Sequence, residues 1–232
     1  MASAGTVQSV KFVIAYDNVA AREGLTADWG FACVVYPSSG PPGIFDTGTD
    51  PSILAHNLQA LKVDISALKW CVISHPHADH YGGLLAILNA NPHIHVYLLE
   101  GFPRSVLQAI DRAGAKCVIV SGPAEIAPGI CTTGPVRGPI TEQSLVVCTP
   151  QGNAVITGCS HPGVVNMVKA AEQAFGQVKM VMGGFHLGGA SRRTIQAIIQ
   201  ELASLGIEWA GALHCTGPVA QELFAEHFGE KY

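Results

Sequence analysis

With 232 residues, 48% of them hydrophobic and 13% charged, the chain is too apolar for a disordered protein and long enough to bury a substantial core. The net charge is −4, and the 13 lysines and arginines are scattered, which argues against a nucleic-acid partner. No apolar stretch approaches the roughly 20 residues that span a bilayer, and the N-terminal residues lack a signal-peptide pattern, so we expect a cytoplasmic protein without a membrane partner.

The first half of the chain alternates short apolar runs with helical patterns. The apolar runs predict strands over residues 7–15, 31–36, 44–48, 70–74, 93–99 and 116–120. Helical spacing predicts helices over residues 51–61, 84–89 and 105–113. The strand over residues 70–74 leads directly into a histidine-rich segment.

The second half begins with residues 122–139, whose many glycines and prolines predict an irregular surface connection. A hairpin is expected from residues 144–149 and 153–157. Beyond it, helical and apolar patterns predict helices over residues 164–175, 192–205 and 219–228, with strands over residues 178–182 and 209–213.

Each half therefore contains a meander of strands together with helices. Amphipathic helices and half-buried sheets are stable only when their apolar faces are covered. We expect an α/β protein with two mixed β-sheets packed face to face and helices outside, an αββα sandwich. No linker divides it, so we expect one domain over residues 1–232. The sequence carries no signal for an oligomeric state.

Four metal-binding side chains lie within six residues of each other, in the order His75, His77, Asp79 and His80. Residues two apart on a regular helix diverge by roughly 200°, so we expect a strand end that turns into a loop. There His75 and His77 can point at one ion while Asp79 and His80 turn towards a second. A surface turn that is rich in histidine by chance is the competing interpretation.

Two ions about 3.5–4 Å apart can share a hydroxide nucleophile and polarise a carbonyl or phosphoryl group. Imidazole and carboxylate ligands suit zinc best, with iron or manganese as alternatives. The segment therefore predicts a pair of divalent metal ions as the cofactor.

The stretch SHPHADHYGG over residues 74–83 is similar to the signature of the metallo-β-lactamase superfamily. Further segments resemble the branch of dihydropterin-methyl-ribofuranosylaminobenzene-phosphate synthase-like proteins: YDN at residues 16–18, FDTG at 45–48, TGCSHPGVVN at 157–166, GGFHL at 183–187 and HCTG at 214–217. The resemblance covers nearly the whole chain and implies the metallo-β-lactamase αββα fold.

The resemblance also implies two later ligands. In the superfamily pattern a third histidine completes the first metal site, which points to His161, and a late histidine completes the second, which points to His214. Many relatives carry a carboxylate that bridges the ions. The GCSH segment at residues 158–161 has none, so His186 or Cys159 is left as the candidate for that position.

Other residues are expected to support the chemistry. Asp79 would position the hydroxide, and His186, in a glycine-rich loop, is a candidate acid or substrate contact, with a structural role as the alternative. Asp46 and Asp17 are expected to orient the metal-binding loop by hydrogen bonds. The remaining histidines near no other ligand type are expected to be surface or packing residues; they are His56, His93, His95 and His227.

Seven cysteines without a CxxC pair do not indicate a disulfide framework, and we expect most of them to be reduced core residues. Packing is the expected role of both Cys159 and Cys215. Neighbours on a strand face opposite ways, so Cys215 should face away from whatever His214 faces. Cys159, two residues from His161, can face the same way as that histidine.

Three functions are consistent with these residues and a small-molecule substrate. The first is a hydrolase in which a metal-bound hydroxide attacks an ester, lactone or phosphoester. The second, implied by the resemblance, is a transferase that joins a dihydropterin methyl group to a ribofuranosylaminobenzene phosphate, although the only paired arginines are Arg192 and Arg193. The third is a metal or ligand sensor without turnover.

Overall fold

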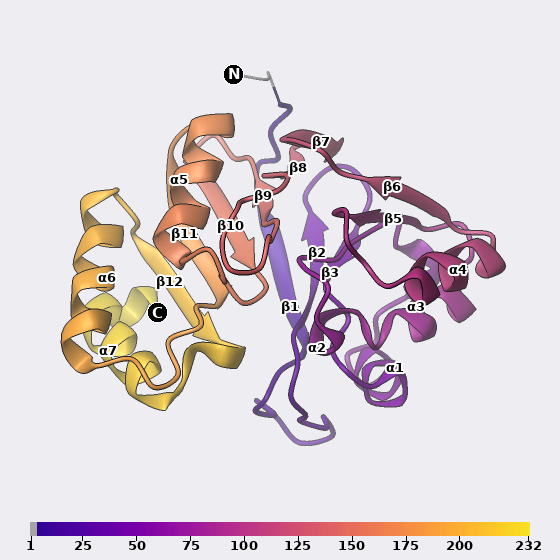
Figure 1. The fold of residues 1–232 in the computed structure, drawn as a ribbon, viewed down its shortest axis with the longest axis horizontal. Coiled ribbons are helices and arrows are strands. Elements are labelled where there is room, and N and C mark those ends of the chain that lie inside the picture. The colour runs from indigo at the N-terminus through magenta and orange to yellow at the C-terminus, as the bar shows by residue number, and fades with distance from the viewer. Residues whose placement is uncertain (1–3) are drawn as a thin grey trace. The chain divides into compact units, whose positions relative to one another are not determined.

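The computed structural model describes residues 4–232, whose contacts form two compact units (Figure 1). The N-terminal unit consists of residues 8–121. The C-terminal unit consists of residues 122–232 together with residues 4–7. Each unit contains one six-stranded sheet and its own apolar core. The single domain expected over residues 1–232 stays a prediction.

The sheet of the N-terminal unit follows the order of the chain. Its strands are β1 (Val10–Tyr16), β2 (Ala32–Pro37), β3 (Gly43–Phe45), β4 (Trp70–Val72), β5 (His95–Leu98) and β6 (Lys116–Ile119). Neighbours are antiparallel from β1 to β3 and parallel from β3 to β6. All the strands predicted in this half are confirmed, with bounds that differ by a few residues.

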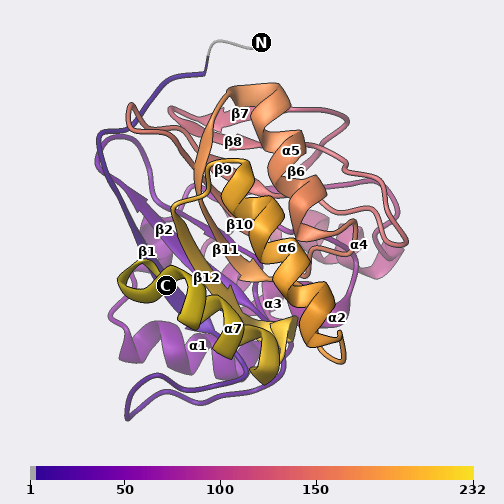
Figure 2. The same ribbon diagram turned by 90° about the vertical axis from the view of Figure 1, so that its left-hand side faces the viewer.

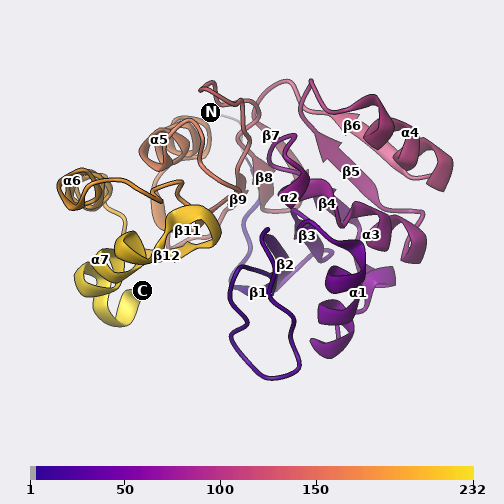
Figure 3. The ribbon, with the colours of Figure 1, turned by 60° about the horizontal axis from the view of Figure 1, so that its bottom comes forward.

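Three longer helices accompany this sheet: α1 (Pro51–Ala60), α3 (Leu84–Ala90) and α4 (Arg104–Ala113). Figure 3 shows them on one side of the strands. Helix α1 begins at Pro51, and Asp50 caps it by accepting hydrogen bonds from the amides of Ser52 and Ile53. Leu54, Leu58 and Ile87 bury the inner faces of α1 and α3 in the core. Two shorter elements complete the unit, η1 (Ile65–Ala67) and α2 (Ala78–Tyr81).

The sheet of the C-terminal unit also follows the chain. Its strands are β7 (Ala124–Ala127), β8 (Ile130–Thr132), β9 (Leu145–Val147), β10 (Asn153–Thr157), β11 (Val178–Gly184) and β12 (Trp209–Leu213). Neighbours are antiparallel from β7 to β10 and parallel from β10 to β12. The hairpin predicted from residues 144–149 and 153–157 is confirmed as β9 and β10.

The irregular connection predicted over residues 122–139 is wrong for residues 124–132, which form β7, a turn and β8, whereas residues 133–139 are irregular apart from one isolated bridge at Val136. Its turn residues lie at the ends of these strands. Pro128 and Gly129 make the tight turn between them, where Gly129 has a φ of 71° and donates its amide to Glu125. Part of the Gly and Pro content of residues 122–139 thus marks the turn of a hairpin, and the rest lies in the irregular chain around it.

Three helices cover the C-terminal sheet: α5 (Val164–Phe175), α6 (Arg192–Ser204) and α7 (Pro218–Phe228). Figure 2 shows them side by side over one face of the strands. Their buried faces include Val168, Ile199 and Leu223, in line with the helical spacing of the sequence. Two short 3-10 turns follow β12 and α7, η2 (His214–Thr216) and η3 (Gly229–Lys231).

The structure therefore confirms the predicted class, two mixed β-sheets flanked by helices. Within residues 4–232 no helix combines the length and apolar character that crossing a membrane requires.

Gly82 and Gly83 let two backbone segments of the N-terminal unit meet without side chains between them. A Cβ at Gly82 would lie 2.0 Å from the carbonyl oxygen of Thr49, and a Cβ at Gly83 would lie 2.0 Å from that of Thr47. The amide of Gly83 donates to the carbonyl of Gly48 at 3.0 Å. The glycines thus fix the turn after β3 against the start of α3.

Replacing Gly83 by alanine should lower the free energy of unfolding by about 1–3 kcal/mol, because the new methyl group forces the two segments apart. Chemical denaturation followed by circular dichroism measures the change. Gly122→Ala is the matched control, since a Cβ there has no neighbour within 4 Å. Equal unfolding free energies for the two variants would contradict this account of the glycines.

Candidate metal centre

His75 and His77 follow β4 and bring two ring nitrogens together. His75 Nε2 and His77 Nδ1 are 3.1 Å apart. His75 is fully buried, and its other nitrogen, Nδ1, lies 2.9 Å from the hydroxyl of Ser74. That contact fixes the imidazole ring and leaves Nε2 facing His77. The pair occupies the end of a buried parallel strand, as the sequence predicts.

Asp79 and His80 form the second pair, on the one-turn helix α2. Asp79 Oδ2 lies 3.5 Å from His80 Nε2 and accepts a hydrogen bond from the indole of Trp29 at 2.9 Å. The expectation that the whole segment is a loop is wrong, because residues 78–81 are helical. His75 and His77 both precede this helix. These two ligands, which are two residues apart, can therefore approach each other without having to lie on one face of a helix.

A buried carboxylate connects the segments that carry the two pairs. Asp46, which follows β3, accepts a hydrogen bond from His80 Nδ1 at 2.7 Å through Oδ2. The same carboxylate accepts from the backbone amide of Ser74 at 2.7 Å and from its hydroxyl at 2.8 Å. The orienting role predicted for Asp46 is therefore confirmed, whereas that of Asp17 stays a prediction.

Asp46 also governs the charge of His80. Burial favours the neutral imidazole, but the charge and hydrogen bond of Asp46, with a smaller effect of Asp79, raise the pKa of His80 to about 10. In the metal-free protein this ring is therefore protonated at neutral pH. A cation that binds Nε2 has to displace that proton.

The donor atoms of the N-terminal unit fit a metal ion. Two ligand nitrogens bound to one tetrahedral ion at about 2.0–2.1 Å lie about 3.3 Å apart, close to the His75–His77 separation of 3.1 Å. The oxygen and nitrogen of Asp79 and His80 have a similar spacing of 3.5 Å. Asp46 is bonded to the far nitrogen of His80, as carboxylates that orient metal ligands commonly are.

In the C-terminal unit, Glu142 organises the loop that follows β10. This fully buried carboxylate accepts four backbone hydrogen bonds of 2.9–3.0 Å, from the amides of Gly158, Cys159, Ser160 and His161. Such bonds replace the hydration that a buried carboxylate would otherwise lose. The loop is thereby held as a tight arc, in which Ser160 has a φ of 61°.

The next two parallel strands deliver two further histidines, each with a strained backbone. His186 follows β11 with a φ of 51°, and His214 begins η2 with a φ of 48°. The hydroxyl of Thr216 accepts the amide of Phe185 at 3.0 Å and donates to the carbonyl of Leu213, which ties the two loops together. Strained residues of this kind are typical of functional sites.

These loops bring Cys159, His161 and His186 together, with every pair of their ligand atoms within 4.8 Å. The rings of His161 and His186 have centroids 4.4 Å apart. Cys159 is buried, His161 is half-buried and His186 is exposed. Three side chains that can bind zinc, one thiol and two imidazoles, thus lie at the carboxyl ends of β10 and β11.

Cys215 was expected to face away from His214, as neighbours on a strand do. That argument does not apply, because both residues lie on the 3-10 turn η2. Its thiol lies 3.7 Å from the carbonyl oxygen of Cys159. A hydrogen bond from Cys159, opposed by burial and assisted by His214 and His186, lowers the pKa of Cys215.

Sequence reasoning missed two contributors. Glu142 precedes β9 in a stretch without a metal-binding motif, where it stands between Thr141 and Gln143 as an isolated acidic residue that gives no signal of its role. Trp29 lies in the long loop before β2 and is 55% exposed. The sequence around it gives no sign of its hydrogen bond to Asp79. Both act through partners that are distant along the chain.

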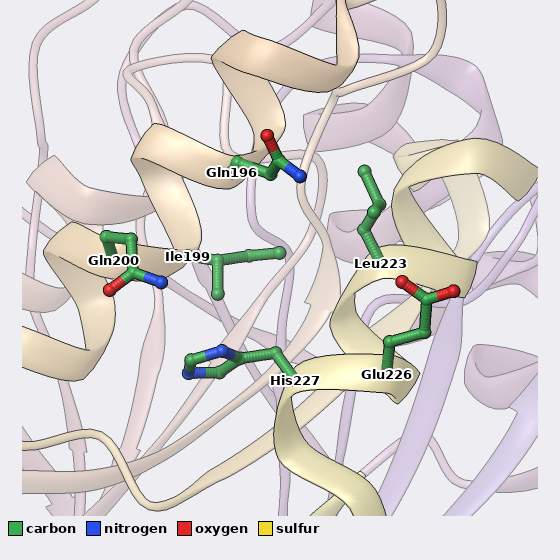
Figure 4. A pocket seen from close by; sticks show the side chains of 6 residues that line it. All are labelled: Gln196, Ile199, Gln200, Leu223, Glu226 and His227. Carbon is green, nitrogen blue, oxygen red and sulfur yellow. The ribbon is translucent and has the colours of Figure 1, made fainter.

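The remaining histidines lie apart from the candidate ligands. His56, His93, His95 and His227 are all exposed, as expected for surface residues. His227 borders a cavity of about 450 Å³ beside α6 and α7 (Figure 4). No candidate metal ligand lines that cavity, whose wall is formed by Gln196, Ile199, Gln200, Leu223, Glu226 and His227.

Comparison with known proteins gives the same family. Residues 33–112, all in the N-terminal unit, match the family model described as the Metallo-beta-lactamase superfamily. The 7,8-dihydropterin-6-methyl-4-(β-D-ribofuranosyl)-aminobenzene-5'-phosphate synthase of Methanocaldococcus jannaschii is 28% identical, over 82% of this chain and 80% of that protein.

Solved structures with a similar fold include members of the same superfamily. A crystal structure described as a metal-dependent hydrolase of the β-lactamase superfamily has a TM-score of 0.79 and 28% identity, over 95% of this chain and 94% of that one. A quorum-quenching N-acyl homoserine lactone hydrolase shares the fold, with a TM-score of 0.51 and 15% identity over 78% of this chain and 93% of its own. The chain is thus similar to the metallo-β-lactamase superfamily in the family-model match over residues 33–112 and in sequence and fold over most of its length.

Proposed function

We propose that this protein is a metal-dependent hydrolase that cleaves an ester, lactone or phosphoester. The observation that carries the proposal is the pairing of four ligand side chains in the N-terminal unit, with donor atoms 3.1 Å apart in one pair and 3.5 Å apart in the other. A relative of 28% identity, described as a metal-dependent hydrolase, supports the same reaction class.

The proposed cofactor is a pair of divalent ions, zinc in the first place, and the roles of His161 and His214 as further ligands, implied by the superfamily resemblance, stay predictions. When bound, the ions would supply a hydroxide nucleophile at neutral pH and polarise the substrate oxygen. Asp79, held by the indole of Trp29, would orient that nucleophile. His186 is exposed and directly follows buried Phe185, and it is proposed to contact the substrate and donate a proton to the leaving group.

The first experiment joins metal analysis with turnover. Purified protein loaded with zinc should contain two ions per chain and hydrolyse at least one member of a panel of esters, lactones and phosphodiesters. His77→Ala should lose metal and activity together, and His186→Gln should keep its metal while its turnover falls by about 10²–10⁴-fold. Exposed His93 provides the control His93→Ala, which should change neither quantity. Turnover that survives His77→Ala would refute the proposal.

The second prediction concerns Asp46. Asp46→Asn removes the carboxylate that orients the His80 ring and makes it a stronger ligand, and we expect metal affinity to fall by about 10–100-fold at pH 9, where competition from the His80 proton is weakest. Because binding displaces a proton from His80, wild-type affinity should rise as pH increases towards 10. This rise should be shallower in Asp46→Asn, where the pKa of His80 is lower.

Competition with a chromophoric chelator between pH 6 and pH 9 measures both effects. The matched control is Asp64→Asn, which alters an exposed aspartate that accepts hydrogen bonds from Ser66 in η1. An Asp46→Asn affinity equal to that of the control at every pH would show that Asp46 does not orient a metal ligand.

A second candidate function is the joining of a dihydropterin methyl group to a ribofuranosylaminobenzene phosphate, favoured by the name of the 28% identical relative from M. jannaschii. Its anionic substrate calls for cationic groups. Arg192 at the start of α6 lies 3.5 Å from Glu222, so part of its charge is already balanced. Incubation of metal-loaded protein with both substrates, followed by mass spectrometry, decides the question. A coupled product that His77→Ala cannot make would favour the transferase over the hydrolase.

A further inference from the structure

The loop between β1 and β2 lies against Asp79 and carries two exposed apolar side chains. Figure 3 shows this loop as a long excursion from the ends of the two strands. Val19 is 70% exposed and Trp29 is 55% exposed. The two flank a hydrogen bond of 3.2 Å from the amide of Gly30 to the side chain of Asn18, so both belong to the base of the loop. Exposed apolar side chains that gather in one place commonly mark a binding surface.

Trp29 directs one edge of its ring at the carboxylate of the candidate metal centre. Its indole N–H donates to Asp79 Oδ2 at 2.9 Å, and the same oxygen lies 3.5 Å from His80 Nε2. The amide of Phe31 donates to the carbonyl of Asp79 at 3.2 Å, and a Cβ at Gly30 would lie only 2.8 Å from that carbonyl oxygen. These contacts, all within the N-terminal unit, place an apolar ring directly beside the Asp79–His80 pair.

We propose that Trp29 is a substrate contact, and that the substrate carries an apolar group next to the bond that is broken. The inference rests on the proposed hydrolase and names the class of its substrate. A group attached to a carbonyl or phosphoryl centre at the Asp79–His80 pair would lie against the indole, with Val19 as a further apolar contact. The flat face of an indole binds apolar groups through burial and aromatic rings through additional stacking.

The loop holds this ring in place before a substrate binds. Asn57 of α1 is 2% exposed and binds both backbone groups of Thr26, since it accepts from the amide and donates to the carbonyl, each at 2.9 Å. The hydroxyl of Thr49 donates to the carbonyl of Trp29 itself. A ring fixed in this way loses little conformational freedom when a substrate packs against it, which favours binding.

Binding of small carboxylates to the zinc-loaded full-length protein tests the inference without reference to turnover. Acetate, butyrate and phenylacetate are the probes, because they share a carboxylate and differ in apolar area. Calorimetry should give a Kd for phenylacetate about 10-fold lower than for acetate, with butyrate between them. Phenylacetate should also change the tryptophan fluorescence of the protein, because its ring would lie against the indole of Trp29.

Two variants separate the ring of Trp29 from its hydrogen bond. Trp29→Gln, which replaces the ring by another N–H donor, should abolish both the preference for phenylacetate and the fluorescence change. Trp29→Phe, which keeps a ring without the donor, should retain most of the preference. Trp209→Gln is the matched control and should behave as the wild type, since it alters a 46% exposed tryptophan of the C-terminal unit. Far-ultraviolet circular dichroism checks that each variant is folded.

Equal affinities for acetate and phenylacetate in the wild type would overturn the inference, and so would a preference that survives Trp29→Gln. Kinetics distinguishes this failure from that of the proposed function. Methyl phenylacetate should have a kcat/KM about 10-fold above that of methyl acetate, and Trp29→Gln should remove this difference. Hydrolysis of both esters with equal kcat/KM would refute the apolar contact alone. Selective binding of phenylacetate without turnover of any ester would refute the hydrolase and leave the contact of Trp29 in place.

Discussion

A carboxylate that is buried has to find its hydrogen-bond partners within the protein, and this constraint shapes both histidine-bearing regions. In the N-terminal unit Asp46 satisfies it with His80 and Ser74, and so joins the end of β3 to the segment after β4. In the C-terminal unit Glu142 satisfies it with four consecutive amides of the loop after β10. Each acid converts a flexible strand end into a fixed arrangement of ligands.

The sequence predicted those parts of the protein that depend on local patterns. Apolar runs and helical spacing located the strands of the N-terminal unit and the helices α5, α6 and α7, because burial of one face imposes a period on neighbouring residues. The histidine motif predicted a metal-binding segment for a related reason. Its four donors are close in the chain, so their proximity in space did not require knowledge of the fold.

What sequence reasoning missed depends on contacts between distant residues. Nothing near Glu142 in the chain shows that the backbone of residues 158–161 will surround it, and the same is true of Trp29 and Asp79. The hairpin of β7 and β8 was missed for another reason, since Pro128 and Gly129 signal a turn equally well in a loop and between strands. The short helix α2 ends at Gly82, where the backbone meets Thr49 in a tertiary contact that the sequence does not show.

The order of strands within each sheet has a consequence for how the chain folds. Every strand pairs with the strand that precedes it in the sequence, from β1 to β6 and again from β7 to β12. Each sheet can therefore grow by the addition of one adjacent strand at a time, and each addition closes only the connection to its predecessor. Because the entropy lost on loop closure rises slowly with length, even the longer helical crossovers add little to the barrier. Local growth of this kind assembles the histidines of each unit from its own consecutive strands.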